Sequence, residues 1–355
     1  MGLPEHSGLD LHAKWPRGPR DLITDVPGVR VGHATLKGGD VHTGVTAVLP
    51  HGGNCFREKV MAGASVINGF GKSVGLIQIE ELGTIETPIL LTNTLSVGTV
   101  CEALTQYMLE DNPDIGVTTG TVNCLVTECN DGRLNDIRGL HVRPEHVRQA
   151  LACAGEDFQE RGRGGGTGMV CLGLKGGIGS ASRLVEADGR TYTIGALVMS
   201  NFGEPGNLVI GGKHYDTRLG REEKKDQGSI IMLLATDLPL NERQLKRLAS
   251  APPWPLGRVG SYCGNGSGDI AIAFTTANRL PHYSEKCVLD VKMFYDENID
   301  RVFEAGWRRW RRPSSAPSTT PRPPPASVEI ITWGSRSSSP GTAASDNLYP
   351  VTFPP

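Results

Sequence analysis

A serine that follows a glycine in a glycine-rich turn is the residue of this chain best placed for covalent chemistry. Gly260 and Ser261 stand in the window RVGSYCGNGSGDIAIAF, which leads from a turn into the strand-like residues 269–275. Because glycine has no Cβ, the Ser261 hydroxyl can reach the carbonyl before it, and the backbone can take strained angles. This predicts an N-to-O acyl shift and ester hydrolysis, which together cut the chain between Gly260 and Ser261.

Such a cut would leave Ser261 with a free α-amino group beside its own hydroxyl. An α-amine has a pKa of about 7.7–8, so it can accept a proton near neutral pH. One residue would then supply both the nucleophile and the base. The alternative interpretation is that Gly260 and Ser261 only form a turn before the strand, as Gly-Ser pairs commonly do.

Blocks on both sides of this junction resemble the DmpA family, the L-aminopeptidase D-amidase/D-esterases that include β-peptidyl aminopeptidases. The similarity runs from about residue 23 to about residue 305, and so many blocks in one order make it specific. The blocks are ITDVPGVRVGH at 23–33, GVTAVLPHGGN at 44–54, INGFGK at 67–72, ETP at 86–88, TNTLSVG at 92–98, NDGRLNDIRG at 130–139, GGTGM at 165–169, KGGIG at 175–179, SNFG at 200–203, GSII at 228–231 and the Gly260-Ser261 junction.

The resemblance implies an α+β fold, a four-layer α/β/β/α sandwich of the DmpA and ornithine acetyltransferase type. It also implies a precursor split into two chains that stay together, assembly of these pairs into a homo-oligomer, and no cofactor. Carried over to this sequence, the family's nucleophile is Ser261, and the amide that helps form its oxyanion hole is Asn201. Such a donor stabilises the transition state by about 3–4 kcal/mol.

For each of the other candidate site residues, a role in catalysis or binding and a role in a turn are both open. Asn201 precedes Phe-Gly at a strand end, where asparagine is also a typical turn residue. Ser267 either hydrogen-bonds the nucleophile or only shapes the turn in which it lies. Asn93, Asn130 and Asp131 are candidates for the lining of the substrate pocket, although Asn and Asp are frequent in tight turns whatever a protein does.

Two glycine-rich stretches invite a phosphate-binding interpretation, but their spacing argues against it. Residues 162–168 read GRGGGTG, and residues 173–179 read GLKGGIG. Neither has the GxxxxGK[ST] spacing of a P-loop, and strand-like residues follow the first stretch where a P-loop has a helix. We expect these glycines to let the backbone lie close to the active site or to a neighbouring sheet.

The surrounding sequence predicts short buried strands that alternate in blocks with a few helices. Apolar, β-branched runs bounded by Gly, Asp or Pro predict strands, and apolar residues at helical spacing predict helices. Such blocks favour sheets inside and helices outside over a doubly wound parallel sheet. The predicted strands are 45–50, 191–199, 229–236 and 269–275, and the predicted helices are 96–110, 144–154 and 241–251.

Composition excludes several classes of function. With 36 Lys and Arg against 38 Asp and Glu, the net charge is −2, which argues against a nucleic-acid partner. No apolar run approaches the roughly 18 residues of a membrane span, so no membrane partner is expected. The eight cysteines include no CxxC pair, and no metal site is predicted. The first residues lack the features of a signal peptide, so we expect a cytoplasmic protein.

The last fifty residues break the pattern of the rest. After residue 305 the sequence turns to Trp, Arg, Pro, Ser and Thr, where family members continue into a Glu- and Ala-rich helix. Such a composition buries too little apolar surface to offset the entropy of ordering. We expect one self-processing domain over 1–305, with 1–260 as the larger subunit and 261–305 as the start of the smaller one, and a disordered or frame-shifted tail over 306–355.

The predicted function is the hydrolytic release of N-terminal amino acids from short peptides, amides and esters. Two alternatives stay open. Ornithine acetyltransferases resemble this family and pass an acyl group to an amine, although their nucleophile is typically Thr, so that Ser261 favours hydrolysis. The altered C-terminus also allows an inactive protein that keeps the scaffold.

Overall fold

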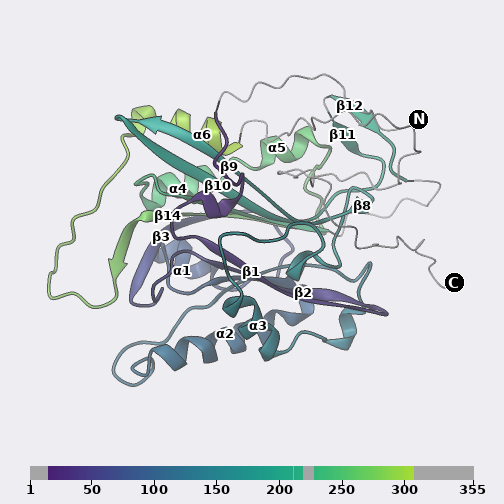
Figure 1. The fold of residues 1–355 in the computed structure, drawn as a ribbon. Helices are drawn as coiled ribbons and strands as arrows, with labels where there is room; N and C mark the ends of the chain where they lie inside the picture. The colour runs from purple at the N-terminus through teal and green to yellow at the C-terminus, as the bar shows by residue number, and fades with distance from the viewer. Residues whose placement is uncertain (1–14, 211, 219–227, 308–355) are drawn as a thin grey trace.

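Two β-sheets packed face to face, with helices over both outer faces, form the body of the molecule (Figure 1). The computed structural model describes residues 15–210, 212–218 and 228–307. The four-stranded sheet contains, in spatial order, β1 (Arg30–Gly38), β2 (Val41–Leu49), β5 (Ile89–Asn93) and β6 (Leu125–Cys129). The six-stranded sheet contains β4 (Thr84–Ile85), β3 (Glu58–Gly69), β14 (Gly268–Pro281), β13 (Ser229–Thr236), β10 (Arg190–Asn201) and β9 (Gly177–Ala187).

Helices close the two outer faces, which gives the four-layer α/β/β/α sandwich expected from the sequence. Figure 1 shows one pair of helices beneath the four-stranded sheet and another pair above the six-stranded one. The lower pair is α2 (Val97–Asp111) and α3 (Pro144–Ala152), and the upper pair is α4 (Glu242–Ala249) and α6 (Asp300–Trp307). The remaining elements are α1 (Leu76–Leu82), α5 (Pro253–Arg258), the hairpin of β7 (Val170–Cys171) and β8 (Leu174–Lys175), the hairpin of β11 (Leu208–Ile210) and β12 (Lys213–Tyr215), and five 3-10 turns, η1 (Ile23–Asp25), η2 (Thr94–Ser96), η3 (Ile137–Gly139), η4 (Gly164–Gly166) and η5 (Asp296–Asn298).

Strand β13 shows how the core is divided between these layers. All of its residues are buried, because strands flank it on both sides and both faces of its sheet are covered. Met232 and Leu234 pack with the residues of α4 and α6, whereas Leu233 and Ala235 pack in the layer between the two sheets. Since successive side chains of a strand point to opposite faces, this alternation sets helices on one side and the other sheet on the opposite side.

Parallel strand pairs account for the positions of the helices. Strands β5 and β6 are parallel and are connected through α2, and β13 and β14 are parallel and are connected through α4 and α5. Parallel neighbours need such crossovers, because a tight turn can join only antiparallel strands. Helix α4 begins at a capping box in which Asn241 Oδ1 accepts from Gln244 N at 2.9 Å and Gln244 Oε1 accepts from Asn241 N at 3.1 Å.

The predicted elements lie where the sequence pattern placed them. The four predicted strands coincide with β2, β10, β13 and β14, and the three predicted helices coincide with α2, α3 and α4, with ends that differ by a few residues. Helix α6 crosses the predicted boundary at residue 306, and its buried Val302 and Ala305 pack on the six-stranded sheet. The rest of the predicted tail, 308–355, lies outside the described residues. None of the described helices is long and apolar enough to cross a membrane.

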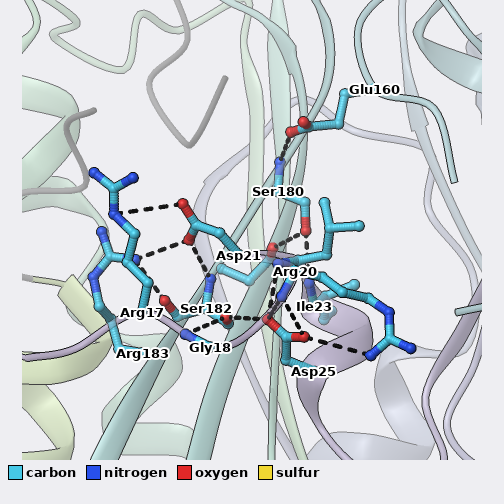
Figure 2. Close-up of polar contacts among 12 residues, drawn as sticks. Arg17, Gly18, Arg20, Asp21, Ile23, Asp25, Glu160, Ser180, Ser182 and Arg183 are labelled. Carbon is cyan, nitrogen blue, oxygen red and sulfur yellow. Dashed lines mark hydrogen bonds and ion pairs between the residues drawn. The ribbon is translucent and has the colours of Figure 1, made fainter. Parts of the chain in front are cut away.

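The outer edge of β9 is covered by the N-terminal segment and by acidic side chains (Figure 2). Strand β9 is the last strand of its sheet, so every second backbone N–H points away from β10. An exposed row of such groups is a template for pairing with another chain. Here the amide of Ser180 donates to Glu160 Oε1 at 2.6 Å, that of Ser182 to Asp21 Oδ1 at 3.1 Å, and that of Leu184 to Pro16 O at 2.8 Å.

Asp21 also forms a buried ion pair at this edge. Its Oδ1 lies 3.0 Å from Nη1 of Arg183, and both side chains are almost fully buried. Arg17 approaches the other carboxylate oxygen at 3.7 Å from the surface side. The Asp21 carboxylate therefore accepts hydrogen bonds both from a backbone amide at the edge of β9 and from the buried guanidinium of Arg183 (Figure 2).

Replacing Asp21 by alanine should lower the free energy of unfolding by about 3 kcal/mol, because it leaves a buried guanidinium without its carboxylate. Chemical denaturation at fixed protein concentration measures this loss. The matched control is Arg148→Ala, which breaks the exposed pair with Glu110 and should leave the midpoint almost unchanged. Equal midpoints for the two variants would refute the importance of the Asp21 contact.

Candidate active site

Ser261 lies in the loop between α5 and β14, where the main chain holds it on both sides. Helix α5 ends at Arg258, and the carbonyl of Val259 then accepts a hydrogen bond from Val209 N of β11 at 3.0 Å. The Ser261 amide donates to Leu256 O at 3.1 Å, and its hydroxyl oxygen accepts from Cys263 N at 3.2 Å. Only 7% of Ser261 is exposed. The side chain is therefore fixed in a buried position in the uncut chain.

Gly260 has a backbone conformation that only glycine adopts without strain at this place. Its φ is +100°, and a Cβ there would lie 1.7 Å from the carbonyl oxygen of Asn207. Real Cβ atoms do not approach main-chain oxygens so closely, and the atom in the way is main chain that cannot swing aside. The peptide bond between Gly260 and Ser261 therefore begins at a residue that the surrounding chain forces into the left-handed half of φ space.

Ser267 closes the turn that follows Ser261. It is fully buried, and its hydroxyl donates to Asp269 Oδ1 at 2.6 Å. Its amide donates to Gly264 O at 2.8 Å, and Asn68 Nδ2 of β3 donates to the same carbonyl at 2.7 Å. In the uncut chain these contacts shape the turn. The structure does not bring the Ser267 hydroxyl into a hydrogen bond with Ser261.

Asn201 lies at the end of β10, where three strands of the large sheet finish or begin together. It is opposite Ser229, the first residue of β13, whose hydroxyl accepts from Gly268 N of β14 at 3.1 Å. The Asn201 side chain is buried, with Oδ1 accepting from Val170 N at 2.9 Å and Nδ2 donating to Asn130 O at 2.7 Å. A carboxamide nitrogen carries two N–H groups, and the bond to Asn130 uses one of them.

The structure therefore joins Asn201 to one other predicted residue and not to Ser261. Asn130 supplies its carbonyl to Asn201, while its own side chain accepts from Gly132 N at 2.9 Å in a local turn. No hydrogen bond connects the Asn201 amide with the Ser261 hydroxyl in the uncut chain. Both groups flank the end of the large sheet where β14 begins.

Asn93 and Asp131 are buried and make contacts within the four-stranded sheet and the loops that follow it. Asn93 Oδ1 accepts from Ser96 N at 3.1 Å, and its Nδ2 donates to Thr43 Oγ1 at 2.7 Å. Asp131 Oδ1 accepts from Asn135 Nδ2 at 3.0 Å. Burial raises the pKa of the Asp131 carboxyl to about 6, against hydrogen bonds from Thr43 and Asn135 that lower it. These contacts stabilise the loops that follow β5 and β6.

Glu128 is a candidate that the sequence analysis missed. It precedes the last residue of β6 and is only 2% exposed. Its Oε1 accepts from Lys72 N at 2.8 Å, and its Oε2 accepts from the Thr94 hydroxyl. Glu128 Oε1 and Gly268 Cα each lie 3.6 Å from the position that a Cβ on Gly71 would occupy. The carboxylate is therefore close to the start of β14. The available signal was one acidic residue inside a strand of otherwise uncharged residues.

No metal centre accompanies these groups in the described part of the chain, where His, Cys, Asp and Glu nowhere gather in threes with metal-binding geometry. The neighbouring Cys129 does not supply a reactive thiolate, because burial raises its pKa well above the usual value. The chemistry available at this end of the sheets is thus a serine hydroxyl, a carboxamide donor and a buried carboxylate.

Comparison with known proteins assigns the family. The model of Peptidase family S58 matches residues 21–312. The chain is 38% identical over 315 residues to the β-peptidyl aminopeptidase BapA of Sphingosinicella microcystinivorans, covering 81% of this chain and 78% of the relative.

Solved structures of similar proteins support the same family assignment. The chain is 41% identical to the L-aminopeptidase D-Ala-esterase/amidase of Ochrobactrum anthropi, a prototype for the serine aminopeptidases and a variant of the Ntn hydrolase fold, with a TM-score of 0.77. It is 54% identical to the PH0078 protein of Pyrococcus horikoshii OT3, also with a TM-score of 0.77. Each superposition covers 82% of this chain and 84% of the other. The chain therefore belongs to peptidase family S58 and is an aminopeptidase of the Ntn hydrolase type.

Proposed function

We propose that this chain cuts its own Gly260–Ser261 bond and that the freed Ser261 then releases N-terminal residues from short peptides, amides and esters. The observation that carries the proposal is the junction itself, where a glycine with a φ of +100° and no room for a Cβ beside Asn207 is followed directly by a buried serine hydroxyl. Family membership favours hydrolysis over acyl transfer to an amine.

Self-cleavage proceeds in two steps, an acyl shift from nitrogen to oxygen and the hydrolysis of the resulting ester. The Ser261 oxygen attacks the Gly260 carbonyl carbon, the C–N bond breaks, and the acyl group passes to the oxygen while the proton passes to nitrogen. Water then hydrolyses the ester to a Gly260 carboxylate and a free Ser261 hydroxyl. The products are an N-terminal chain that ends at Gly260 and a C-terminal chain that begins with a serine α-amine.

Turnover uses this amine as the base. With a pKa of about 7.7–8 it takes the hydroxyl proton as Ser261 attacks the substrate carbonyl, and it returns the proton to the leaving amine. The free N–H of Asn201 Nδ2 stabilises the oxyanion of the tetrahedral intermediate. Water then hydrolyses the acyl-enzyme and regenerates Ser261.

Glu128 supplies the selectivity for a free amino terminus. Its carboxylate is buried, and the two groups that donate to it, a backbone amide and a threonine hydroxyl, are both neutral. A buried carboxylate with neutral partners favours a cationic ligand, because a paired charge costs less in this environment than an isolated one. The α-ammonium of a peptide substrate has that charge.

The two cleaved chains stay together because β14 lies inside the large sheet. It pairs with β13 on one side and with β3 on the other, and both neighbours belong to the N-terminal chain. Assembly of these pairs into a homo-oligomer draws support from the loop between β14 and α6, which Figure 1 shows swinging away from the body. Val288, Met293 and Tyr295 of this loop are exposed, and a further copy of the chain would cover them.

Self-cleavage should yield chains of 260 and 95 residues, detected by intact mass spectrometry of the purified protein. Ser261→Ala should remain a single chain and hydrolyse no amino-acid p-nitroanilide. Gly260→Ala should cut at least tenfold more slowly, since its Cβ displaces the backbone from Asn207. The control is Gly257→Ala, where a Cβ meets nothing within 4 Å. A wild-type chain that stays whole after long incubation under native conditions contradicts the proposal.

Glu128→Gln should raise KM for substrates with a free amino group by about 10–100-fold, the value of a hydrogen bond to a charged group. Rates for N-acetylated substrates should hardly change, because they carry no ammonium. The control is Glu86→Gln, which removes a buried carboxylate paired with Lys59 at 2.6 Å away from this end of the sheets. A loss of activity that is the same for free and acetylated substrates would exclude the assigned role.

Asp131→Asn should stabilise the protein more at pH 8 than at pH 4. Burial raises the pKa of the folded-state carboxyl to about 6, so the folded state binds the proton more tightly than the unfolded state does. The stability that this proton confers is full below about pH 4 and is lost as pH rises through 6. The two effects should differ by about 2–3 kcal/mol in urea denaturation. A variant with the same effect at both pH values would show that the pKa of Asp131 is the same in the folded and the unfolded state.

A further inference from the structure

Lys175 holds together the loop that contacts Asn201, although nothing in the catalytic sequence of events uses it. It lies in β8, opposite Val170 of β7. Its ammonium donates to three backbone carbonyls, those of Gly166 at 3.0 Å, Met169 at 3.0 Å and Gly176 at 2.7 Å. A protonated lysine has three N–H donors and no acceptor, so these carbonyls match its charged form one for one.

The three carbonyls lie in residues 166–176, and this segment also contains Val170, whose amide donates a hydrogen bond to Asn201. Val170 follows Met169 directly, and its amide donates to Asn201 Oδ1 at 2.9 Å. The amide of Gly176 donates to Met169 O at 2.9 Å, which ties the two sides of the hairpin together. The ammonium therefore anchors the residue immediately before the one that positions the Asn201 side chain.

Gly176 brings this anchor into contact with the end of β10. A Cβ on Gly176 would lie 2.2 Å from Ser200 O and 3.1 Å from Val170 N. Ser200 immediately precedes Asn201, so the backbone beside the ammonium touches both the strand that carries Asn201 and the amide that holds its side chain. Without the ammonium, three carbonyl dipoles would converge on an empty position, and their repulsion would open the loop at this contact.

The charge of Lys175 has an electrostatic consequence as well. Lys175 is exposed as a whole residue, but desolvation of its ammonium among the carbonyls, with the nearby Lys37, lowers its pKa to about 7. The three carbonyl acceptors favour the charged form. The charged form of Lys175, with its three donors, therefore prevails below about pH 7.

We propose that Lys175 is a positioning residue of the oxyanion hole: it gathers the carbonyls of Gly166, Met169 and Gly176 so that Val170 N–H fixes Asn201, leaving the second N–H of Asn201 aimed at the substrate. This inference rests on the proposed role of Asn201. Lys175 touches no substrate, so its removal should reduce kcat and leave the binding of the substrate ammonium at Glu128 intact.

The experiment compares Lys175→Met, Lys175→Arg and Asn201→Ala with the double variant of Lys175→Met and Asn201→Ala. Lys175→Met should lower kcat by about 10–100-fold, less than the loss of an oxyanion donor itself, with KM within about threefold. Lys175→Arg keeps the charge and should recover much of the rate. The double variant should be no slower than Asn201→Ala, because residues that act through one another are not additive.

Lys59→Met is the matched control, since it removes another lysine whose ammonium is held by oxygen acceptors, here those of Glu86 far from Asn201. It should lower thermal stability and leave kcat within about twofold. If Asn201→Ala keeps the wild-type kcat, the role of Asn201 fails and this inference fails with it. If Asn201→Ala is impaired while Lys175→Met is not, or if the two losses multiply in the double variant, only the inference about Lys175 fails.

A crystal structure of Lys175→Met decides the same question without any activity. The distance from Val170 N to Asn201 Oδ1, 2.9 Å here, should exceed hydrogen-bond range in the variant and stay unchanged in Lys59→Met. An unchanged distance in Lys175→Met would overturn the inference.

Discussion

The contact between the two sheets is the constraint on which the site depends. Apolar side chains of both sheets fill the layer between them and fix how one sheet lies on the other. The end of β6 thereby meets the end of β10, where Asn201 Nδ2 donates to Asn130 O at 2.7 Å and Cys129 Sγ donates to Met199 O at 3.5 Å. A slip of one strand spacing, about 4.8 Å, would break both bonds. The carboxamide of one sheet and the carboxylate of the other would then separate.

Glycines allow the backbone to come close enough for this arrangement. Gly260 passes the carbonyl of Asn207, and Gly176 passes the carbonyl of Ser200, at distances that leave no room for a Cβ. At both places a main-chain segment replaces a side chain in the packing. A side chain at Gly260 would displace the bond to be cut, and one at Gly176 would displace the hairpin that holds Asn201. The high glycine content therefore serves the site as well as the turns.

Local sequence patterns predicted the parts of the structure that local forces determine. The predicted strand 229–236 and the predicted helix 241–251 each depend on one continuous segment, and so does the Gly260-Ser261 junction. The position of Glu128 depends on Lys72 and Thr94, which come from other segments. No pattern around any one of these residues shows that they meet.

Two other residues show a further limit of the sequence. Lys175 is bound by main-chain carbonyls, and carbonyls leave no signature in a sequence because every residue has one. Asn93 stays a candidate for the pocket lining, because Asn serves in turns and in sites alike, and its contacts with Ser96 and Thr43 show that it also caps a short helix. Residue type alone does not separate these roles.

The proposed self-cleavage would change the chemistry of Ser261 as well as the connectivity of the chain. Before the cut, the Ser261 nitrogen is an amide that donates to Leu256 O and cannot act as a base, and the hydroxyl is buried. In the proposed mechanism the cut converts this nitrogen into an amine and releases Gly260 from the φ of +100° that the intact chain imposes. β14 stays paired with β3 and β13, so Ser261 keeps its place. The peptide bond whose cleavage we propose therefore also keeps the α-amine blocked for as long as that bond is intact.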